Sequence, residues 1–360
     1  MRKVTLVVIA VLLFNILNFA QDESKGKIHG YMFGDYFYNL SRDENSSDIS
    51  NAAEKGEKEF NGFQFRRIYF GYDYSINKKF STRFRVEANQ TENTSGGKIG
   101  LFVKDAYIKW ENIISGSDLV VGFSPTPTWN VSESYWGYRS LAKTIMDLRK
   151  IGSSRDFGIS AKGKLSKDGS IKYWLMAANG EGNKPEDDKH KSVYGHVAIQ
   201  PVKDFTITLY GDFRSKEDII GPNSGEKLGN NIMTTAVFAG YKKAGKFSFG
   251  LEGFYQLQQN ELNTQAGLDE KTSIGISVFG SADISEKISF VGRYDYFDPV
   301  SNSDFEGDVR NYFLAAINYK ADPKVWVMPN ITMETYDDLP NGVEFDAALT
   351  GRITLFYKFN

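Results

Sequence analysis

The sequence predicts an all-β chain that closes into a sixteen-stranded antiparallel barrel, and three observations lead to that fold class. Apolar and polar residues alternate with period two along many segments of about ten residues. The connections between these segments alternate between short turns and long polar loops. Aromatic residues make up 14% of the 360 residues, and many lie near segment ends. One face of each strand is therefore expected to meet an apolar environment and the other face to meet water.

The amino-terminal segment carries a targeting pattern. Two basic residues precede an apolar run over residues 4–17, and small Ala20 ends it before a polar stretch. We interpret residues 1–20 as a secretory signal peptide, because the run is shorter than the roughly 20 apolar residues that a membrane anchor needs. Residues 21–360 are then expected to form one barrel domain, since no linker or composition shift divides them.

Strand periodicity runs from residue 27 almost to the end of the chain. Over residues 79–89, Phe80 and Phe84 share one face of the predicted strand, and Arg83 and Arg85 share the other. The sixteen predicted strands cover residues 27–39, 63–76, 79–90, 99–111, 117–125, 156–166, 170–179, 191–201, 204–215, 231–242, 246–257, 272–283, 286–297, 310–320, 324–334 and 343–359.

The connections fall into two length classes that alternate along the chain. The short ones lie at 77–78, 112–116, 167–169, 202–203, 243–245, 284–285 and 321–323. The long ones lie at 40–61, 91–98, 126–154, 180–190, 216–230, 258–271, 298–309 and 336–341. Bacterial outer-membrane barrels have an even strand number, tight turns at one rim and long loops at the other. The sequence therefore predicts a transmembrane barrel of the bacterial outer membrane. Aromatic strand ends, charges in mid-strand and the lack of a linker disfavour a soluble pair of β-sandwiches.

Composition excludes several functional classes. The chain has no Cys and three His, which excludes disulfides, Cys-ligated zinc and thiol catalysis. A formal net charge of -2 provides no basic field for nucleic acid. Because the common hydrolase, nucleotide and zinc-protease motifs are missing from the sequence, we expect no enzyme activity, cofactor or metal. His196 lies on the inward face of its predicted strand, and we interpret it as an ordinary lumen residue rather than as part of a catalytic triad.

The polar faces of the predicted strands indicate an aqueous interior. In the strands where apolar and polar residues alternate clearly, eight basic and eight acidic residues lie on the inward face. These equal numbers predict that the barrel wall selects neither anions nor cations. A barrel of about sixteen strands is wide enough to leave a channel. The lumen-wall residues that we single out are Arg83, Arg85, Glu87, Lys162, Arg214, Arg293 and Arg352.

The longest connection, over residues 126–154, has a pattern unlike that of a polar loop. Its apolar residues at 138, 141, 145 and 148 recur at helical spacing, which predicts a short amphipathic helix that ends near Gly152. An external loop needs an apolar stripe only where it packs against something. We therefore expect this third extracellular loop to fold inward against the barrel wall. The alternative is a helix that caps the loop and faces neighbouring loops.

The same loop carries the residues predicted to line the pore constriction. These are Arg139, Lys143, Asp147, Arg149 and Lys150. Together with Glu133 they give the loop a net charge of +2, since four bases oppose two acids. Charged groups at a constriction set ion preference, so this loop favours anions.

Six short strings carry a resemblance to a known family. They are FRRIYFG at 65–71, FRVE at 84–87, KDAYIKW at 104–110, VGF at 121–123, WGYR at 136–139 and DFG at 156–158. Together they resemble the phosphate-selective porin O and P family. The resemblance implies a sixteen-stranded outer-membrane porin, usually trimeric, that passes small anions. In that family phosphate specificity rests on inward Arg residues and a Lys cluster, whereas here inward acids match the inward bases.

These observations predict an outer-membrane porin that forms a water-filled channel for passive diffusion of small hydrophilic solutes and ions. The channel is expected to lean to anions, with phosphate as one candidate. Its expected partners are outer-membrane lipid and lipopolysaccharide, small anions or other hydrophilic solutes, and two further copies of the chain in a homotrimer. The alternative is a structural or adhesive barrel whose lumen is closed.

Overall fold

The computed structural model describes residues 26–43, 56–222, 225–264, 267–302, 309–337 and 344–359. The predicted signal peptide, residues 1–20, lies outside these ranges and stays a prediction. Among the described residues, no helix has the length and apolar character required to cross a membrane.

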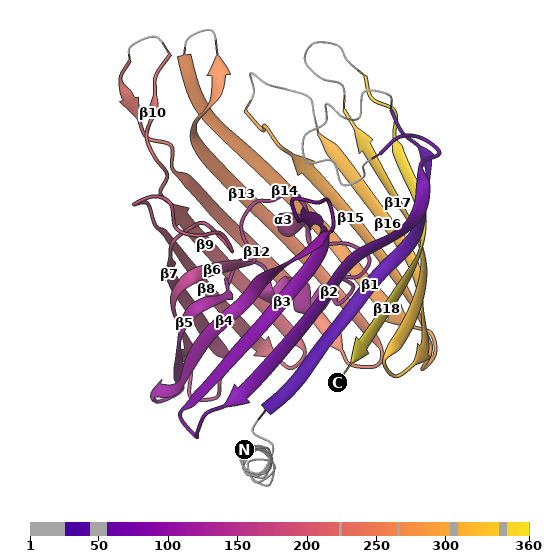
Figure 1. Cartoon of the computed structure of the whole chain (residues 1–360), viewed down its shortest axis with the longest axis horizontal. Helices are drawn as coiled ribbons and strands as arrows, with labels where there is room; N and C mark the ends of the chain where they lie inside the picture. Colours follow the sequence, from indigo (N-terminus) through magenta and orange to yellow (C-terminus); the bar gives the residue numbers. More distant parts are fainter. Residues whose placement is uncertain are drawn as a thin grey trace, which may run out of the picture.

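Sixteen antiparallel strands close into one barrel, each paired with its neighbours in chain order (Figure 1). β1 (Gly26–Ser41) closes the ring against β18 (Ala348–Phe359), with Gly30 opposite Phe359. A separate pair, β10 (Ile219–Ile220) and β11 (Lys227–Leu228), lies in the loop after β9. The other barrel strands are β2 (Asn61–Ser75), β3 (Phe80–Asn93), β4 (Ile99–Ile114), β5 (Ser117–Pro125), β6 (Arg155–Lys164), β7 (Ile171–Ala178), β8 (Ser192–Val202), β9 (Phe205–Arg214), β12 (Ile232–Lys243), β13 (Phe247–Thr264), β14 (Gly267–Asp283), β15 (Ile288–Asp298), β16 (Arg310–Asp322) and β17 (Val325–Tyr336). The fold class predicted from the sequence is confirmed.

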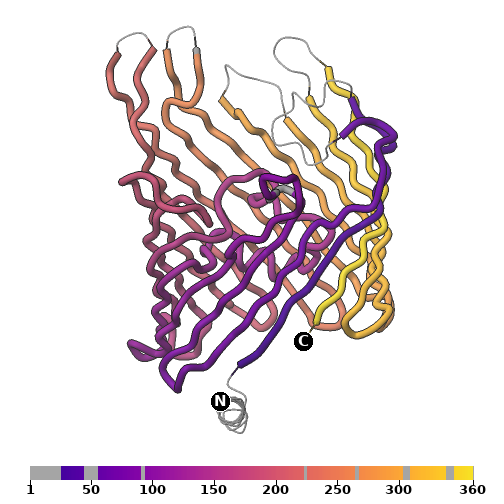
Figure 2. Tube along the Cα trace, in the orientation of Figure 1, coloured from indigo at the N-terminus to yellow at the C-terminus, as the bar shows by residue number. Residues whose placement is uncertain are grey.

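The two rims of the barrel differ as the connection lengths predict. Short turns join the strands at one rim, and the start of β1 and the end of β18 lie on that side, as the trace in Figure 2 shows. The β10–β11 hairpin lies at the opposite rim, where β13 ends and β14 begins (Figure 1). We refer to these as the short-turn rim and the long-loop rim.

Some predicted strand boundaries are wrong. β13 continues to Thr264 and β14 begins at Gly267, where the sequence predicted a loop over residues 258–271. Backbone pairing resumes after an irregularity between Gln258 and Leu262. The extension was missed because a hairpin beyond the apolar belt needs only backbone hydrogen bonds and no alternating side chains. β18 begins at Ala348 rather than at residue 343, and residues 344–347 form no strand.

The outer face of the barrel is apolar and the inner face is polar. Phe70, Phe84 and Leu209 are 48%, 49% and 54% exposed, whereas Glu87 and Asp105 are buried. Aromatic residues near the strand ends are also exposed; among them are Tyr36, Tyr38, Tyr72, Tyr74, Trp110, Tyr255, Tyr294 and Tyr319. This arrangement reverses that of a soluble protein and fits an outer face in contact with lipid.

Two β-bulges interrupt the period of two on neighbouring strands. The β1–β2 register shifts between Phe33 and Gly34, which leaves Arg66 as the extra residue on β2. The β3–β4 register shifts between Arg85 and Val86, which leaves Lys104 as the extra residue on β4. A bulge sets two successive residues of one strand opposite one residue of its partner. Each of these two bulges therefore adds a basic residue that alternation does not place on the inner face.

Candidate pore constriction

The connection over residues 126–154 contacts strands from widely separated parts of the ring. Ser132 donates a hydrogen bond to Glu252 of β13 at 2.8 Å. Arg214 of β9 donates to the carbonyl oxygen of Ile151 at 2.7 Å, and Arg66 of β2 donates to that of Leu141 at 3.1 Å. Each wall residue here lies on the polar face of its strand. The connection is thus fastened to the barrel by hydrogen bonds to strands far apart in the ring.

The single helix predicted for this connection is wrong. The structure has α2 (Asn130–Trp136), which ends where Gly137 takes a left-handed conformation with φ of 69°, and the one-turn α3 (Ile145–Leu148). Leu141 packs in a cluster with Trp136, whereas Ile145 packs in a second cluster. The helical spacing of these apolar residues arises because the chain contributes to two clusters in turn, so Gly152 ends no helix.

Three of the predicted constriction residues form one ionic cluster. Arg139 pairs with Asp147 and lies 3.2 Å from Glu133, and Lys143 Nζ lies 3.2 Å from Asp147 Oδ1. Burial favours the neutral form of Asp147, but the charges of Arg139 and Lys143 outweigh it and hold the pKa of Asp147 below its ordinary value. Two bases and two acids make this loop cluster neutral, so it does not carry the positive charge predicted for the loop.

The other two predicted constriction residues lie apart from this loop cluster. Arg149 Nη1 lies 2.6 Å from Glu334 Oε1 on β17, and both side chains are completely buried. Its guanidinium also lies 5.0 Å from the ring centroid of Phe297. Lys150 is exposed and has a positive φ of 59°. Arg149 therefore holds the loop to the wall, and its charge is hidden from solvent.

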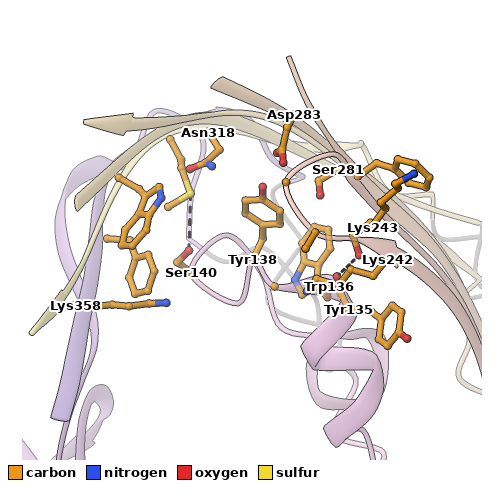
Figure 3. Close-up of a pocket in the computed structure, with 18 residues that line it drawn as sticks. Tyr135, Trp136, Tyr138, Ser140, Lys242, Lys243, Ser281, Asp283, Asn318 and Lys358 are labelled. Carbon is orange, nitrogen blue, oxygen red and sulfur yellow. Dashed lines mark hydrogen bonds between the residues drawn. The ribbon is translucent and has the colours of Figure 1, made fainter. Parts of the chain in front are cut away.

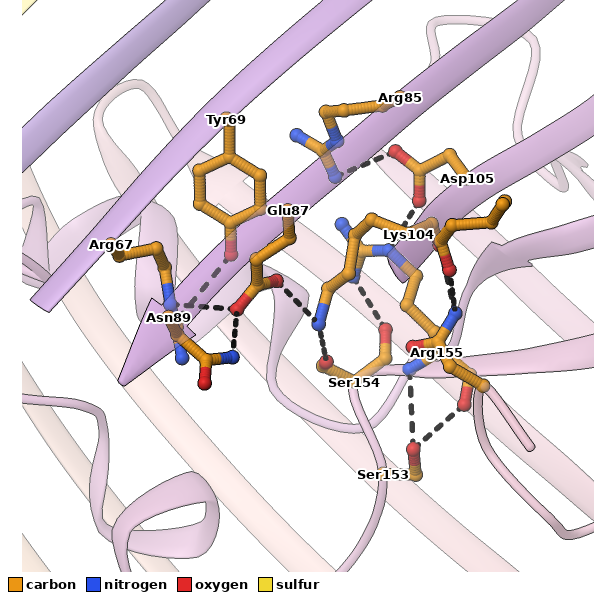
Figure 4. A network of polar contacts seen from close by, with 12 residues as sticks. Arg67, Tyr69, Arg85, Glu87, Asn89, Lys104, Asp105, Ser153, Ser154 and Arg155 are labelled. Carbon is orange, nitrogen blue, oxygen red and sulfur yellow. Dashed lines mark hydrogen bonds and ion pairs between the residues drawn. The ribbon is translucent and has the colours of Figure 1, made fainter. Parts of the chain in front are cut away.

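A second ionic network lines the inner face of β2, β3 and β4 and the start of β6 (Figure 4). Glu87 lies 2.8 Å from Arg67 Nε and 3.0 Å from Lys104 Nζ. Asp105 lies 2.6 Å from Arg85 Nη2 and 2.5 Å from Arg155 Nε. Two bases share each of these carboxylates, as the paired dashed lines in Figure 4 show.

The same network extends to β1, where Arg66 Nε lies 2.8 Å from Asp35. We call this group the basic arc; its members are Arg66, Arg67, Arg85, Lys104 and Arg155, with the acids Asp35, Glu87 and Asp105. Five bases and three acids leave the basic arc with a net charge of +2. Unlike Arg149, every base of the arc keeps part of its side chain exposed.

The loop cluster lies close to the basic arc. Arg67 is one of the charges that lower the pKa of Asp147. Tyr69 and Tyr31, on the strands that carry the arc, are among the groups that act on Arg139, whose pKa is raised by Asp147 and Glu133 against the effect of burial. Arg66 of the arc also donates to the carbonyl oxygen of Leu141, between Arg139 and Lys143, so the arc and the loop cluster are neighbours, with the surplus positive charge on the wall.

The remaining predicted wall residues have different surroundings. Arg293 donates to the carbonyl oxygen of Lys143 and pairs with Asp295, and Arg214 lies 3.2 Å from Asp212 while it holds Ile151. These two residues anchor the loop. The others lie elsewhere on the inner face: Arg83 pairs with Asp73 at 2.6 Å, Lys162 stacks over Trp174 at 4.8 Å and Arg352 donates to Thr332 at 3.0 Å.

Sequence reasoning missed Arg66, Lys104, Asp105 and Arg155. Strict alternation assigns adjacent residues to opposite faces, so it cannot place Arg66 with Arg67, or Lys104 with Asp105, on one face. The available signal was the pair of adjacent charges inside an otherwise alternating strand, which occurs at residues 66–67 and 104–105. Such a pair in a spanning strand indicates a bulge, because the alternative places a charge in lipid.

A small cavity of about 260 Å³ lies between the carboxyl end of α2 and the wall (Figure 3). Tyr135, Trp136 and Tyr138 line it from the loop, and Lys242 lines it from β12. Lys242 Nζ donates to the carbonyl oxygen of Ser134 at 2.7 Å. Loop and wall thus leave some space between them on the side away from the basic arc.

Comparisons with known proteins support the fold. No family model matches the chain, and no curated protein does so. Solved structures do match. The anion-selective porin from Comamonas acidovorans shares 11% identity at a TM-score of 0.63, over 94% of this chain and 100% of that one. The outer membrane channel DcaP of Acinetobacter baumannii shares 10% sequence identity at a TM-score of 0.66, over 93% of this chain and 97% of that one. The trimer form of OmpT, an outer membrane protein of Vibrio cholerae, shares 13% sequence identity at a TM-score of 0.58, over 94% of this chain and 100% of that one. The chain has the fold of these outer-membrane proteins.

Proposed function

We propose that this protein is a porin of the bacterial outer membrane, through which small hydrophilic solutes and ions diffuse passively. The observation that carries the proposal is the basic arc on the inner face of a closed sixteen-stranded barrel. A barrel of this strand number has room for an aqueous channel. Partly exposed charges on its inner face require water or ions beside them, since an unsolvated charge is costly.

The connection over residues 126–154 is proposed to fold into the lumen and narrow this channel. Its hydrogen bonds to β2, β9 and β13 and its ion pair to β17 support this arrangement. The narrowest part then lies between the loop cluster around Asp147 and the basic arc. Of the predicted constriction residues, Arg139, Lys143 and Asp147 keep that proposed role, and Lys150 is proposed to face the long-loop side of the constriction.

The proposed channel favours anions. The loop cluster is neutral, so the preference comes from the surplus of two positive charges in the basic arc. Charge on one side of a constriction attracts counter-ions into it. The fold shared with an anion-selective porin is compatible with this preference. Phosphate stays one candidate solute, on the sequence resemblance to the phosphate-selective porin O and P family.

Planar-bilayer conductance of the refolded protein tests the function. We expect stepwise conductance, with a reversal potential across a potassium chloride gradient that indicates anion preference. Arg139→Ala should shift this potential, because it leaves Asp147 and Glu133 opposite the arc. Block by millimolar phosphate would support phosphate as a solute. A folded, heat-modifiable barrel without conductance would overturn the porin proposal and favour the structural or adhesive barrel.

The assembly and surroundings of the barrel follow from the same proposal. The exposed apolar belt is proposed to contact outer-membrane lipid, and the long loops are proposed to contact lipopolysaccharide. A homotrimer is proposed by analogy with the trimer form of OmpT of Vibrio cholerae. Light scattering of the protein in detergent, corrected for bound detergent, measures the number of chains in the particle.

A further inference from the structure

A second cavity, of about 470 Å³, lies near the short-turn rim, on the side of β5 to β8. The start of α2 closes it from the loop side with Asn130, and Lys162, Lys172, Trp174 and His196 line it from the wall. It is separate from the basic arc and from the cavity in Figure 3, with which it shares no lining residue. Its volume falls in the range of about 300 to 1,000 Å³ that small-molecule sites occupy.

The wall of this cavity is one row of side chains across four strands. Asp118 on β5 lies opposite Lys162 on β6, which lies opposite Trp174 on β7, which in turn lies opposite His196 on β8. Residues paired in this way project from the same face of the sheet. Backbone register therefore holds a cation, an aromatic ring and an imidazole side by side.

The cavity has more positive than negative charge. Lys162, Lys164 and Lys172 line it, and Asp118 is its one lining carboxylate. Among the described residues, none of the three Lys side chains has an ion-pair partner, whereas Asp118 lies 3.8 Å from Lys109. Lys162 Nζ lies 4.8 Å from the ring centroid of Trp174. A ligand beside Lys162 would thus have a cation next to its anionic group and an aromatic ring next to an apolar part.

Two polar groups in this row are buried without a hydrogen bond. His196 is only 8% exposed, and neither of its ring nitrogens has a partner in the described part of the chain. The same holds for the indole nitrogen of Trp174, which is also buried. Buried polar atoms are usually satisfied, because leaving one unpaired costs its whole desolvation penalty. Both residues line the cavity beside Lys162, so an anionic ligand there would lie next to the two side chains that lack a polar partner.

We infer that this cavity binds a small organic anion, namely a carboxylate attached to a flat apolar body. The carboxylate accepts a hydrogen bond from Lys162, and the apolar body lies beside the rings of Trp174 and His196. The inference goes beyond the proposed porin function, because binding in this cavity does not require that the barrel conduct ions.

Benzoate is a suitable probe, and the three His make the measurement simple. The full chain, refolded in detergent and labelled with 15N in its His rings, is titrated with benzoate, and the His196 signal is assigned by its loss in His196→Gln. We expect a saturable shift of that signal at millimolar benzoate. Lys162→Met should weaken binding about tenfold, as expected when one charge-assisted hydrogen bond is lost. Lys287→Met, which removes an equal charge from an exposed turn, should leave the affinity unchanged.

Two results would overturn the site. One is a His196 signal that benzoate does not shift, in a protein whose barrel is shown to be folded by heat-modifiable migration. The other is an equal shift with acetate and with chloride, because that would show a response to ions without a place for the apolar body. If Lys162→Met does not fold, Lys172→Met provides the same comparison. Since conductance is not the readout, failure here leaves the porin proposal standing, and absence of conductance leaves this site standing.

Discussion

The basic arc and the opposite side of the inner wall are both rich in charge, yet they use it differently. In the arc two bases share one carboxylate, as Arg67 and Lys104 share Glu87, and the bases keep part of their surface exposed. On the opposite side, acids on β13 to β17 meet the loop over residues 126–154. There Arg149 pairs with Glu334 and both are completely buried. The arc keeps a surplus of positive charge even though its Arg66 also bonds to the loop, whereas on the packed side paired charges fasten the loop.

This difference shows that an inward-facing charge is not always a channel-lining charge. Arg293 faces inward as the sequence predicts, but it is 95% buried because it binds Asp295 and the loop carbonyl of Lys143. The balance of eight bases and eight acids predicted from strand phase mixes the two kinds. In the proposed channel, ion selectivity depends on the exposed charges, and we therefore expect the basic arc to set it.

The largest expected effect is on the packed side. Arg149→Met removes the ion pair between Arg149 and the buried Glu334, and loss of one member of a buried pair costs about 3 to 5 kcal/mol. The free energy of unfolding, measured with urea in lipid vesicles, should fall by about 3 to 5 kcal/mol. The double variant Arg149→Met with Glu334→Gln should recover part of the loss. Equal stability of Arg149→Met and the parent would show that this pair does not hold the loop.

The second prediction removes the surplus charge of the arc. In Arg85→Gln with Lys104→Gln, Asp105 keeps Arg155 and Glu87 keeps Arg67, so no carboxylate is left unpaired. The net charge of the arc falls from +2 to zero, because two of its five bases are neutralised while its three acids remain. The reversal potential across a salt gradient should move to the value of a non-selective channel.

The matched control removes the same charge from exposed turns, in Lys287→Gln with Lys324→Gln. It should keep the anion preference of the parent. If the control and the arc variant shift the potential equally, selectivity reflects total charge and the arc has no special role.

The sequence predicts the barrel well and the constriction only in part. Period two and alternating connection lengths are properties of single strands, so they fix the strand number without knowledge of tertiary contacts. Arg139, Lys143 and Asp147 were all predicted for the same loop, but their ion pairs were not, and the single helix expected there is replaced by two short ones. Bulges at Arg66 and Lys104 depend on register between strands, which one strand's pattern does not contain.

The third prediction concerns pH and the loop cluster. The pKa of Asp147 is lower in the folded protein than its ordinary value of about 3.9, so its pairing stabilises the loop fully above that value. This contribution is lost as the pH falls below about 4 toward the folded pKa. Parent stability should therefore drop between pH 5 and pH 3 by more than that of Asp147→Asn, in urea unfolding at about 0.1 M salt. The same drop in both proteins would assign the acid sensitivity to other carboxylates.

The smallest effect tests the backbone that separates α2 from the loop cluster. Gly137 has a φ of 69°, and a Cβ built there has no neighbour closer than the Tyr135 carbonyl oxygen at 4.0 Å. Gly137→Ala should therefore lower the free energy of unfolding by about 1 kcal/mol through backbone strain alone. Gly62→Ala, which also meets nothing within 4 Å but has no positive φ, should change little. If both variants match the parent, α2 ends because Leu141 and Ile145 pack in separate clusters, and the left-handed turn is a consequence of that packing. A selective loss in Gly137→Ala means instead that the turn itself helps to direct Arg139 toward Asp147.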